Sequence, residues 1–566
     1  MAIFLPLVAV AVEHISVLSD EDAALYSQIF ILQDKEKIES AKKLEVKLKD
    51  KSLMNEVLYQ RYVSKTYRTR GAELQDWMNK YYDMPGADRL AKIAKIKQAS
   101  VRKPVVPSIM TGKDYIETAQ SENWTAKTYN ERTTKTINKF KKAIRSGSSK
   151  TARNILEDKG FKRKISESDY GRLAGRLSFL YYTNGEYELA KKWGFVASDA
   201  KSEYGLWAMG LLYFKEQKYA ESQKYFSRIL NLTQINNARK TEAAFWAGRS
   251  ANITGNTEDA EKYWKVAAAY PMSFYGALAS TMLGDVPYYE FFDQECSDED
   301  IEELQKHKYG KKALALIQVG RKDRAERYLK YLVTSKSEDK TLHAVNAVSS
   351  LYGLPSVSIL VSGVMRDRGI LEINDDIIYS AQYPLPDWEP MGGWSIDRAL
   401  LLAITKQESG FKTNAKSNAG ANGLMQIMPS TAKRVARKND VKMSEIDMSK
   451  PEHNMFLGQQ YIVDLLSHQV IKNNIIKMLV AYNAGMGNLV KFEKSFSTSD
   501  PLLYIESFPA YETRNYIKRV MSNLWLYRAR LNQPLTALKE LADGNWPYYN
   551  SEDAYVQNGD WYKSYL

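Results

Sequence analysis

The sequence predicts an all-α protein. Its 566 residues include only 30 Gly and 16 Pro, so few residues interrupt helices, and residues that favour helices are frequent. Helical patterns follow one another from about Glu21 to Leu371, and a weak repeat of paired helices lies within that stretch. A chain of this length is too long for one hydrophobic core, so we expect several domains.

Residues 1–20 resemble a truncated export leader. Residues 3–12 form a largely apolar run that ends in Ala9-Val10-Ala11, but no Lys or Arg precedes the run. A buried first helix is the alternative that stays open, and the leader is the favoured interpretation. No other stretch is apolar over a sufficient length to span a bilayer, so we expect no transmembrane segment.

An α-superhelical repeat domain is predicted at residues 21–297. Three segments align at offsets of 32 and 38 residues, beginning at Leu177, Met209 and Ala247. Each contains a small residue where helices would approach closely, a turn, and a second helix that bears aromatics. This pattern is typical of paired helices that stack into a superhelix, and it resembles tetratricopeptide-type repeats. We expect the aromatics to form an inter-helix core rather than a ligand site.

Changes in composition divide the remainder of the chain. Further amphipathic helices predict a helical linker domain at 298–380. Three prolines and a Gly pair between Tyr383 and Trp394 mark the clearest boundary, and a compact helical domain follows at 381–531. The tail at 532–566 is rich in aromatics, which predicts that it docks on the body of the protein. Its aromatics include Trp546, Tyr548, Tyr549, Trp561 and Tyr562.

The charge of the chain suits an anionic partner. A net charge of +13 and a pI of about 9.2 are compatible with nucleic acid, an acidic membrane surface or an acidic cell-wall polymer. Eight basic residues and no acid lie between Arg132 and Arg153. A solvated helix face explains such a run more simply than a binding site, and no RNA-binding signature accompanies it, so we expect no nucleic-acid partner.

Metal and disulfide chemistry find no support in the sequence. Cys296 is the only cysteine, which excludes an intramolecular disulfide. The five histidines show no metal-ligand spacing. We therefore expect no metal and no cofactor.

Glu408 is the first candidate for catalytic chemistry. Ile396, Leu400, Ile404 and Glu408 are spaced by four residues, so Glu408 extends an apolar helix ridge, and Gly410 supplies the stop. Burial and the negative end of the helix dipole both disfavour a charged carboxylate there. Both effects raise its pKa, as a general acid near neutral pH requires. A glutamate that merely frays from a helix end is the alternative.

Two further residues extend the candidate site. Tyr482 lies on the predicted buried face of a helix with Ile475, Met478 and Leu479, where its phenol could donate a hydrogen bond or serve as core. Glu512 lies one turn into a predicted helix, where the dipole favours its charged form. A capping residue is the simpler explanation for Glu512. Two carboxylates in contrasting environments would suit one acid and one permanent anion.

Four short motifs occur in order in the C-terminal part of the chain. They are Gln407-Glu408-Ser409, Gly423-Leu424-Met425-Gln426, Ala481-Tyr482-Asn483 and Glu512-Thr513-Arg514-x-Tyr516. Together they resemble the catalytic domain of the soluble lytic murein transglycosylases of glycoside hydrolase family 23. The resemblance is strong over about 385–530 and looser upstream, where the helical repeats follow in the family's order. Lys406 departs from the Arg that the family commonly has before Gln-Glu-Ser.

The resemblance implies a superhelix in the form of a ring or horseshoe, followed by a small lysozyme-like catalytic domain. It implies that Glu408 is the catalytic residue and that nine others bind the glycan or steady the acid. These are Ser417, Gly423, Met425, Gln426, Ala481, Tyr482, Asn483, Glu512 and Tyr516. It also implies a periplasmic monomer that acts on peptidoglycan glycan strands; protein partners are not indicated.

The family's chemistry would use Glu408 twice. Glu408 would protonate the oxygen between N-acetylmuramic acid and N-acetylglucosamine, with help from the 2-acetamido group. As a carboxylate it would then deprotonate the muramic C6 hydroxyl, which closes a 1,6-anhydro ring in an exolytic reaction. No acid occurs from Lys412 to Lys438, so no second carboxylate lies close to Glu408 in the sequence.

Three alternatives stay open. A goose-type lysozyme would hydrolyse the same bond, although the lack of an acid at 412–438 argues against it. A helical scaffold that binds glycan without cleaving it is a second alternative, against which the intact Glu408, Gln426 and Tyr482 argue. Nucleic-acid binding, the third, rests on charge alone.

Overall fold

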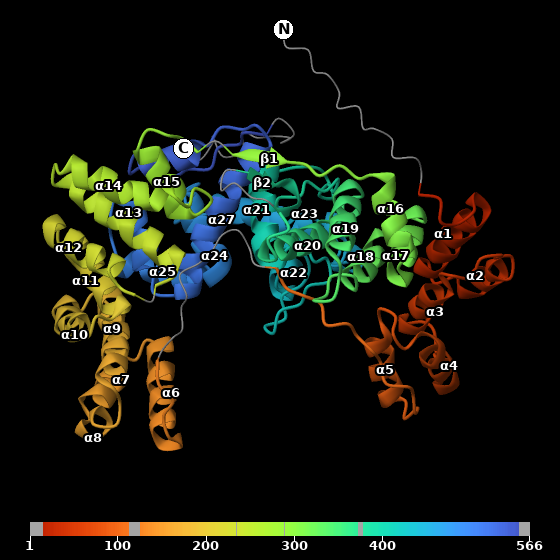
Figure 1. Cartoon of the computed structure of the whole chain (residues 1–566), viewed down its shortest axis with the longest axis horizontal. Helices are drawn as coiled ribbons and strands as arrows, with labels where there is room; N and C mark the ends of the chain where they lie inside the picture. The colour runs from red at the N-terminus through yellow and green to blue at the C-terminus, as the bar shows by residue number, and fades with distance from the viewer. Residues whose placement is uncertain (1–14, 113–124, 234, 288, 372–376, 554–566) are drawn as a thin grey trace, which may run out of the picture. The chain divides into compact units, whose positions relative to one another are not determined.

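The protein is mainly helical (Figure 1). The computed structural model describes residues 15–112, 125–233, 235–287, 289–371 and 377–553, and all statements on structure refer to these. They contain α-helices α1 to α28 and two three-residue strands, β1 and β2, so the predicted all-α class is confirmed. Most of the predicted leader at 1–20 lies outside the described residues. Among those described, no helix combines the length and apolar character needed to cross a membrane.

The chain divides into two compact units. Unit 1 comprises the described residues of 15–112, 290–387 and 410–413, and unit 2 comprises those of 125–289, 388–409 and 414–553. The predicted domain boundaries at 21, 298, 381 and 532 stay predictions, as does the ring or horseshoe.

Unit 1 joins the N-terminal helices to the helices that precede the proline-rich segment. Glu56 of α3 accepts hydrogen bonds from Arg324 (2.9 Å) and Tyr328 (2.7 Å) of α18, and all three side chains are buried. The strands pair in parallel with Glu290 opposite Ile377. The elements are α1 (Asp20–Asp34), α2 (Ile38–Glu45), α3 (Met54–Val63), α4 (Gly71–Tyr81), α5 (Ala87–Ile96), β1 (Glu290–Phe292), α16 (Asp298–Gln305), α17 (Lys308–Gln318), α18 (Lys322–Lys330), α19 (Asp339–Leu351), α20 (Pro355–Asp367), β2 (Ile377–Tyr379) and the 3-10 helix η1 (Ser380–Gln382).

The first part of unit 2 consists of paired helices, as the repeat predicts (Figure 1). Gly210 lies against Phe226 of the next helix so closely that a Cβ would come within 2.7 Å of the ring. Trp207 and Phe226 pack edge to face at 5.1 Å, which places these aromatics in the inter-helix core. The helices are α6 (Glu131–Arg145), α7 (Ser149–Glu157), α8 (Lys159–Lys162), α9 (Glu167–Thr183), α10 (Tyr187–Asp199), α11 (Glu203–Lys215), α12 (Tyr219–Leu230), α13 (Asn237–Ile253), α14 (Thr257–Ala268) and α15 (Phe274–Met282).

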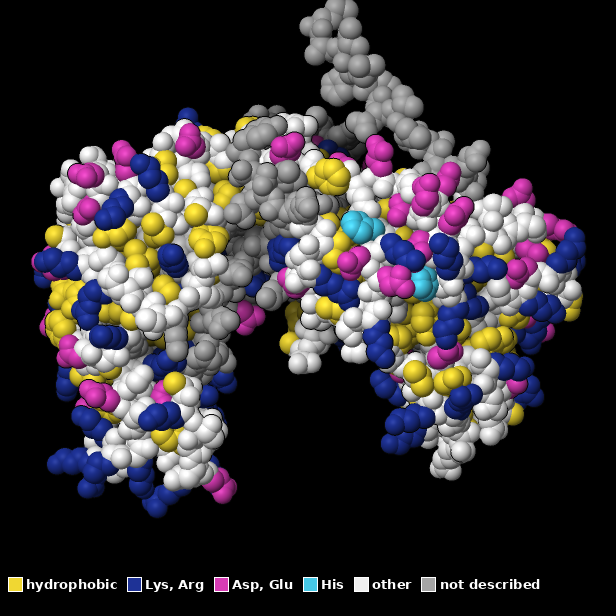
Figure 2. Space-filling view, viewed as in Figure 1, with side chains coloured by type: hydrophobic (Ala, Val, Ile, Leu, Met, Phe, Trp, Pro, Cys, Tyr) yellow, Lys and Arg dark blue, Asp and Glu magenta, His cyan; other side chains and the backbone are white. Residues whose placement is uncertain are grey.

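The basic run lies on α6 and α7. Most of its side chains are exposed, and Lys and Arg gather on this end of the unit in the view of Figure 2. Lys135 pairs with Glu131 at 2.7 Å and Arg153 with Glu157 at 3.7 Å, each one turn apart. These contacts fit the predicted solvated helix face.

The second part of unit 2 holds the compact C-terminal helices. They are α21 (Arg398–Ser409), α22 (Pro429–Lys438), the 3-10 helix η2 (Met443–Glu445), α23 (Pro451–Leu466), α24 (Ile475–Ala484), α25 (Met486–Ser495), α26 (Pro501–Ser507), α27 (Tyr511–Arg530) and α28 (Thr536–Ala542). The tail docks on them as predicted, at least through residue 553. Tyr549 is buried, and its backbone N–H donates to the carbonyl of Asn473 at 2.8 Å. Trp561 and Tyr562 lie outside the described residues.

A buried ion network joins the two parts of unit 2. Lys518 of α27 donates to Glu242 of α13 and, at 2.9 Å, to Glu506 of α26. Glu242 also pairs with Arg239 at 2.7 Å, and Tyr275 of α15 donates to Glu506 at 2.7 Å. Each of the five side chains is less than one tenth exposed. The network fixes α27 against the repeat helices, and α27 also carries residues of the candidate site.

Candidate active site

Helix α21 presents Glu408 at its last turn. Ile396, Leu400 and Ile404 are almost completely buried, which confirms the predicted ridge, although the helix begins only at Arg398. The helix ends at Ser409, and Gly410 adopts a φ of 56°, a left-handed conformation that glycine favours at helix ends. The Glu408 side chain is therefore half-buried at the exit of an apolar helix.

Helix α27 holds both ends of α21. Asp397, just before α21, accepts a hydrogen bond of 2.8 Å from Arg528 of α27, and both side chains are buried. At the other end, the hydroxyl of Tyr516 donates to Oε1 of Glu408 at 2.8 Å. Tyr516, near the start of α27, contacts the end of α21, and Arg528, near the end of α27, contacts the start of α21. The two helices therefore pack antiparallel. The position of Glu408 thus depends on two side chains of one neighbouring helix.

The surroundings of Glu408 raise the pKa of its carboxyl to about 7. Burial is the largest cause, because it removes water from the charged form. The hydrogen bond from Tyr516 opposes burial by stabilising the carboxylate, and the negative charge of Glu512 adds a smaller increase. The predicted direction is confirmed, and the value places the carboxyl where it can both give and take a proton near neutral pH.

Tyr482 contacts the loop before α22 rather than Glu408. Its hydroxyl donates to the carbonyl of Met425 at 2.8 Å. Its ring stacks on Tyr516 at 6.4 Å and lies 5.3 Å from Tyr461 of α23. Tyr482 and Tyr461 are only partly buried, so these rings form an aromatic wall beside Glu408.

Glu512 is the second residue of α27 and is exposed. It therefore lies nearer the helix start than the sequence suggests, and its charge faces water. The next residue, Thr513, donates its hydroxyl to the side chain of Asn483 at 2.7 Å. This hydrogen bond links the Ala481-Tyr482-Asn483 motif to the start of α27.

The loop motif 423–426 is held by its own contacts. A Cβ at Gly423, whose φ is 76°, would lie 2.4 Å from the carbonyl of Met448, so only glycine fits. Gln426 donates its side-chain amide to the carbonyl of Gly423 at 2.8 Å, and the hydroxyl of Ser417 accepts from the N–H of Ala421 at 2.9 Å. The structure thus gives Gly423, Gln426 and Ser417 local roles in shaping the loop.

Ala481 and Met425 are completely buried, so their side chains face the core. The backbone carbonyl of Ala481 accepts the N–H of Gly485 at 2.9 Å. Of the ten predicted site residues, the structure therefore brings Glu408, Tyr516, Tyr482 and Met425 into one connected group. Their roles toward a substrate stay predictions.

Sequence reasoning missed Asn454 and the pair Asp397 and Arg528. Asn454 of α23 is completely buried; it accepts from the N–H of Met425 at 2.8 Å and donates to the carbonyls of Asn422 (3.1 Å) and Met448 (3.0 Å). These bonds fix the loop that carries Met425, whose carbonyl accepts the hydroxyl of Tyr482. The available signal was weak: Asn454 lies in the first turn of α23, directly before the apolar residues Met455 and Phe456, and a buried polar residue needs partners.

Comparison with known proteins identifies the C-terminal part. A family model described as the transglycosylase SLT domain matches residues 389–505. The soluble lytic murein transglycosylases of Salmonella typhimurium and Escherichia coli K12 are 34% identical over 162 residues and 35% over 139 residues. These matches cover 27% and 24% of this chain, and 24% and 21% of the relatives, so the chain spans about a quarter of the length of each. The chain therefore carries a transglycosylase SLT domain.

Solved structures extend the likeness to the whole fold. The 70 kDa soluble lytic transglycosylase of Escherichia coli has a TM-score of 0.55 at 15% identity, with 94% of this chain and 99% of that chain covered. A 70-kDa soluble lytic transglycosylase in complex with bulgecin A has a TM-score of 0.60 at 17% identity, with 91% and 98% covered. The fold of this chain is thus that of the soluble lytic transglycosylases, as the sequence resemblance implies.

Proposed function

We propose that this protein is a lytic transglycosylase that cleaves peptidoglycan glycan strands. The observation that carries the proposal is Glu408, a half-buried carboxyl whose pKa is raised to about 7 within an SLT domain. Such a group is protonated often enough to donate to a leaving oxygen, and basic enough afterwards to take a proton.

Glu408 acts first as the acid. It protonates the glycosidic oxygen between N-acetylmuramic acid and N-acetylglucosamine while the muramic 2-acetamido oxygen bonds to C1. The glycosidic C1–O bond breaks, and N-acetylglucosamine leaves with the new hydroxyl. The carboxylate that remains accepts the proton of the muramic C6 hydroxyl, whose oxygen bonds to C1 and displaces the acetamido oxygen. The product is a 1,6-anhydro end, and no water is consumed. We propose exolytic action in the periplasm by a monomer.

Glu512 has a supporting role in this route. Among the described residues it is the one acid whose charge raises the pKa of Glu408, and it is exposed at a helix N-terminus. It therefore acts as a fixed negative charge that stabilises the positive charge developing on the sugar. Tyr482, Asn483 and Gln426, whose side chains are partly exposed, line the groove for the glycan, and the buried Met425 holds the hydroxyl of Tyr482 through its carbonyl.

Mass spectrometry of the products from purified peptidoglycan tests the proposal. Wild type should release 1,6-anhydro muropeptides, and Glu408→Gln should lower the rate by about 100-fold or more, because it removes the general acid. Glu445→Gln, an exposed glutamate of η2, is the matched control. Reducing ends in the product would favour a goose-type muramidase, and unchanged cleavage by Glu408→Gln would overturn the proposal.

A further inference from the structure

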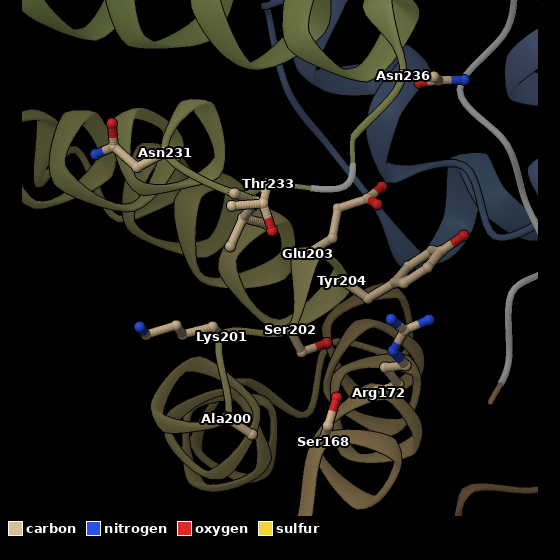
Figure 3. A pocket seen from close by; sticks show the side chains of 11 residues that line it. Ser168, Arg172, Ala200, Lys201, Ser202, Glu203, Tyr204, Asn231, Thr233 and Asn236 are labelled. Atoms are coloured by element: carbon tan, nitrogen blue, oxygen red, sulfur yellow. The ribbon is translucent and has the colours of Figure 1, made fainter. Parts of the chain in front are cut away.

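A polar pocket lies in the repeat helices of unit 2 (Figure 3). Its volume is about 530 Å³, within the range of small-molecule sites. All of its lining residues come from the segment 168–236, so none belongs to the SLT domain. The function proposed above does not use this pocket.

The pocket combines charges of both signs with hydrogen-bonding groups. Arg172 of α9 and Lys201, which precedes α11, supply positive charge, and Glu203 at the start of α11 supplies negative charge. Arg172 and Tyr204 lie on one side of the view and Lys201 on the other, with the hydroxyl groups of Ser168 and Ser202 between them (Figure 3). A ligand here meets two cations and one anion.

Two of the lining side chains, Glu203 and Tyr204, are held in place by arginines that do not line the pocket. Arg239, which is buried, donates its Nε to Glu203 at 2.6 Å and is itself paired with Glu242 at 2.7 Å. The guanidinium of Arg176 lies 3.6 Å from the centre of the Tyr204 ring. These contacts fix the carboxylate and the aromatic face before any ligand arrives, which reduces the entropy lost on binding.

The charges select the chemical class of the ligand. Arg172 already lies 3.9 Å from the buried Asp169 and Glu203 already accepts from Arg239, and a neutral sugar would bring no opposite charge to either of them or to Lys201. A phosphate would suit Arg172 and Lys201 but would be repelled by Glu203. A short peptide that carries both carboxylates and an amine matches all three groups, and its amides match the surrounding hydroxyl and amide groups.

We propose that this pocket binds the peptide that is attached to peptidoglycan glycan strands. Its carboxylates pair with Arg172 and Lys201, and its amine pairs with Glu203. The proposal rests on the proposed function, because that function makes peptide-bearing glycan the substrate. The pocket would then hold the peptide of a strand at a site separate from Glu408.

Calorimetric titration of the full chain with a synthetic stem tetrapeptide (L-alanine, D-glutamate, meso-diaminopimelate and D-alanine) tests this. We expect saturable binding that Arg172→Gln and Lys201→Gln each weaken by about tenfold, as the loss of one charge-assisted hydrogen bond implies. Arg163→Gln and Lys240→Gln are matched controls, because both side chains are exposed and neither lines the pocket. The controls should bind as wild type does. Thermal melting confirms that each variant is folded.

No binding by wild type, or equal binding by pocket and control variants, overturns the proposal. Two further titrations use inorganic phosphate and the peptide-free disaccharide. If either probe binds, and Arg172→Gln weakens its binding as much as it weakens peptide binding, the proposal is also overturned. The pocket would then be an anion site or a sugar site. The tetrapeptide has no glycosidic bond, so its binding does not depend on cleavage. Cleavage of peptidoglycan by wild type, measured separately, shows whether the proposed function holds.

Discussion

Tyr516 donates a hydrogen bond of 2.8 Å to the carboxyl of Glu408 from the neighbouring helix. This contact opposes the main effect at the site, because burial raises the pKa of Glu408 while the hydrogen bond lowers it. The pKa of about 7 is thus a balance between two structural features. Either can be changed by mutation, and the pH dependence of cleavage reports the result.

Tyr516→Phe should move the alkaline limit of activity upward. The variant removes the hydrogen bond that stabilises the carboxylate, so the pKa of Glu408 should rise, by about one unit for a bond to a charged group. The acid then stays protonated to higher pH. Profiles of kcat/KM against pH for wild type and variant measure the shift, and a downward shift would contradict the assigned geometry.

Glu512→Gln should move the same limit in the opposite direction. The negative charge of Glu512 raises the pKa of Glu408, so its removal should lower that pKa and bring the decline of activity to lower pH. Raised salt should weaken the difference, because Glu512 is exposed. Glu445→Gln serves as control and should leave the profile unchanged.

The sequence predicts the helical core of this site well. The ridge of Ile396, Leu400 and Ile404 and the stop at Gly410 follow from local periodicity, and the structure reproduces them. The partner of Glu408 does not follow, because a hydrogen bond between residues 108 positions apart depends on how α21 packs on α27. The resemblance places Tyr516 among the residues that bind the glycan or steady the acid, and in the structure its hydroxyl donates to the acid.

Other contacts between distant segments cannot be predicted from the sequence either, because they also depend on how the helices pack. The apolar pattern of the repeats predicts helix pairs, yet nothing in it predicts that Glu242 meets Lys518. Asn454 carries no motif, although its three hydrogen bonds fix the loop beside Tyr482. Buried polar residues need partners, but periodicity does not say which partners they find.

Glu408→Gln should stabilise the protein at alkaline pH. Folding raises the pKa of Glu408 from 4.5 to about 7. The wild type therefore loses stability as pH rises from about 4.5 through 7, because the half-buried carboxyl of the folded protein must then ionise. Because glutamine carries no charge, the variant should be more stable by about 1–3 kcal/mol above pH 7, a range that allows for partial solvent screening. Melting temperatures at pH 4 and pH 8 test this: the difference should be small at pH 4 and larger at pH 8.

Gly458→Ala should disturb the loop beside Glu408. A Cβ at Gly458 of α23 would lie 2.0 Å from the sulfur of Met425, which is completely buried and whose carbonyl accepts the hydroxyl of Tyr482. We expect a loss of about 1–3 kcal/mol in stability, together with lower kcat/KM. Gly487→Ala is the matched control, since nothing lies within 4 Å of its added Cβ. Equal melting temperatures for the two variants would argue against the close packing.

Lys518→Met should show that the repeat helices support the C-terminal helices of unit 2. Lys518 is buried between Glu242 and Glu506, so its loss leaves two carboxylates without their shared cation. Breaking a buried ion pair in this way lowers the free energy of unfolding by about 3–5 kcal/mol, which exceeds the stabilisation from the buried methionine side chain. Lys491→Met, at an exposed lysine of α25, should change the melting temperature little.

Adding Glu242→Gln to Lys518→Met separates the ionic effect from lost packing. If the buried carboxylate of Glu242 causes the damage once Lys518 is gone, its neutralisation should restore part of the melting temperature, so the double variant should be more stable than the sum of the single losses predicts. Additive losses would instead mean that the lysine acts through its aliphatic stem. Because Lys518 lies on the same helix as Tyr516, the single variant should also lower kcat/KM at temperatures where it remains folded.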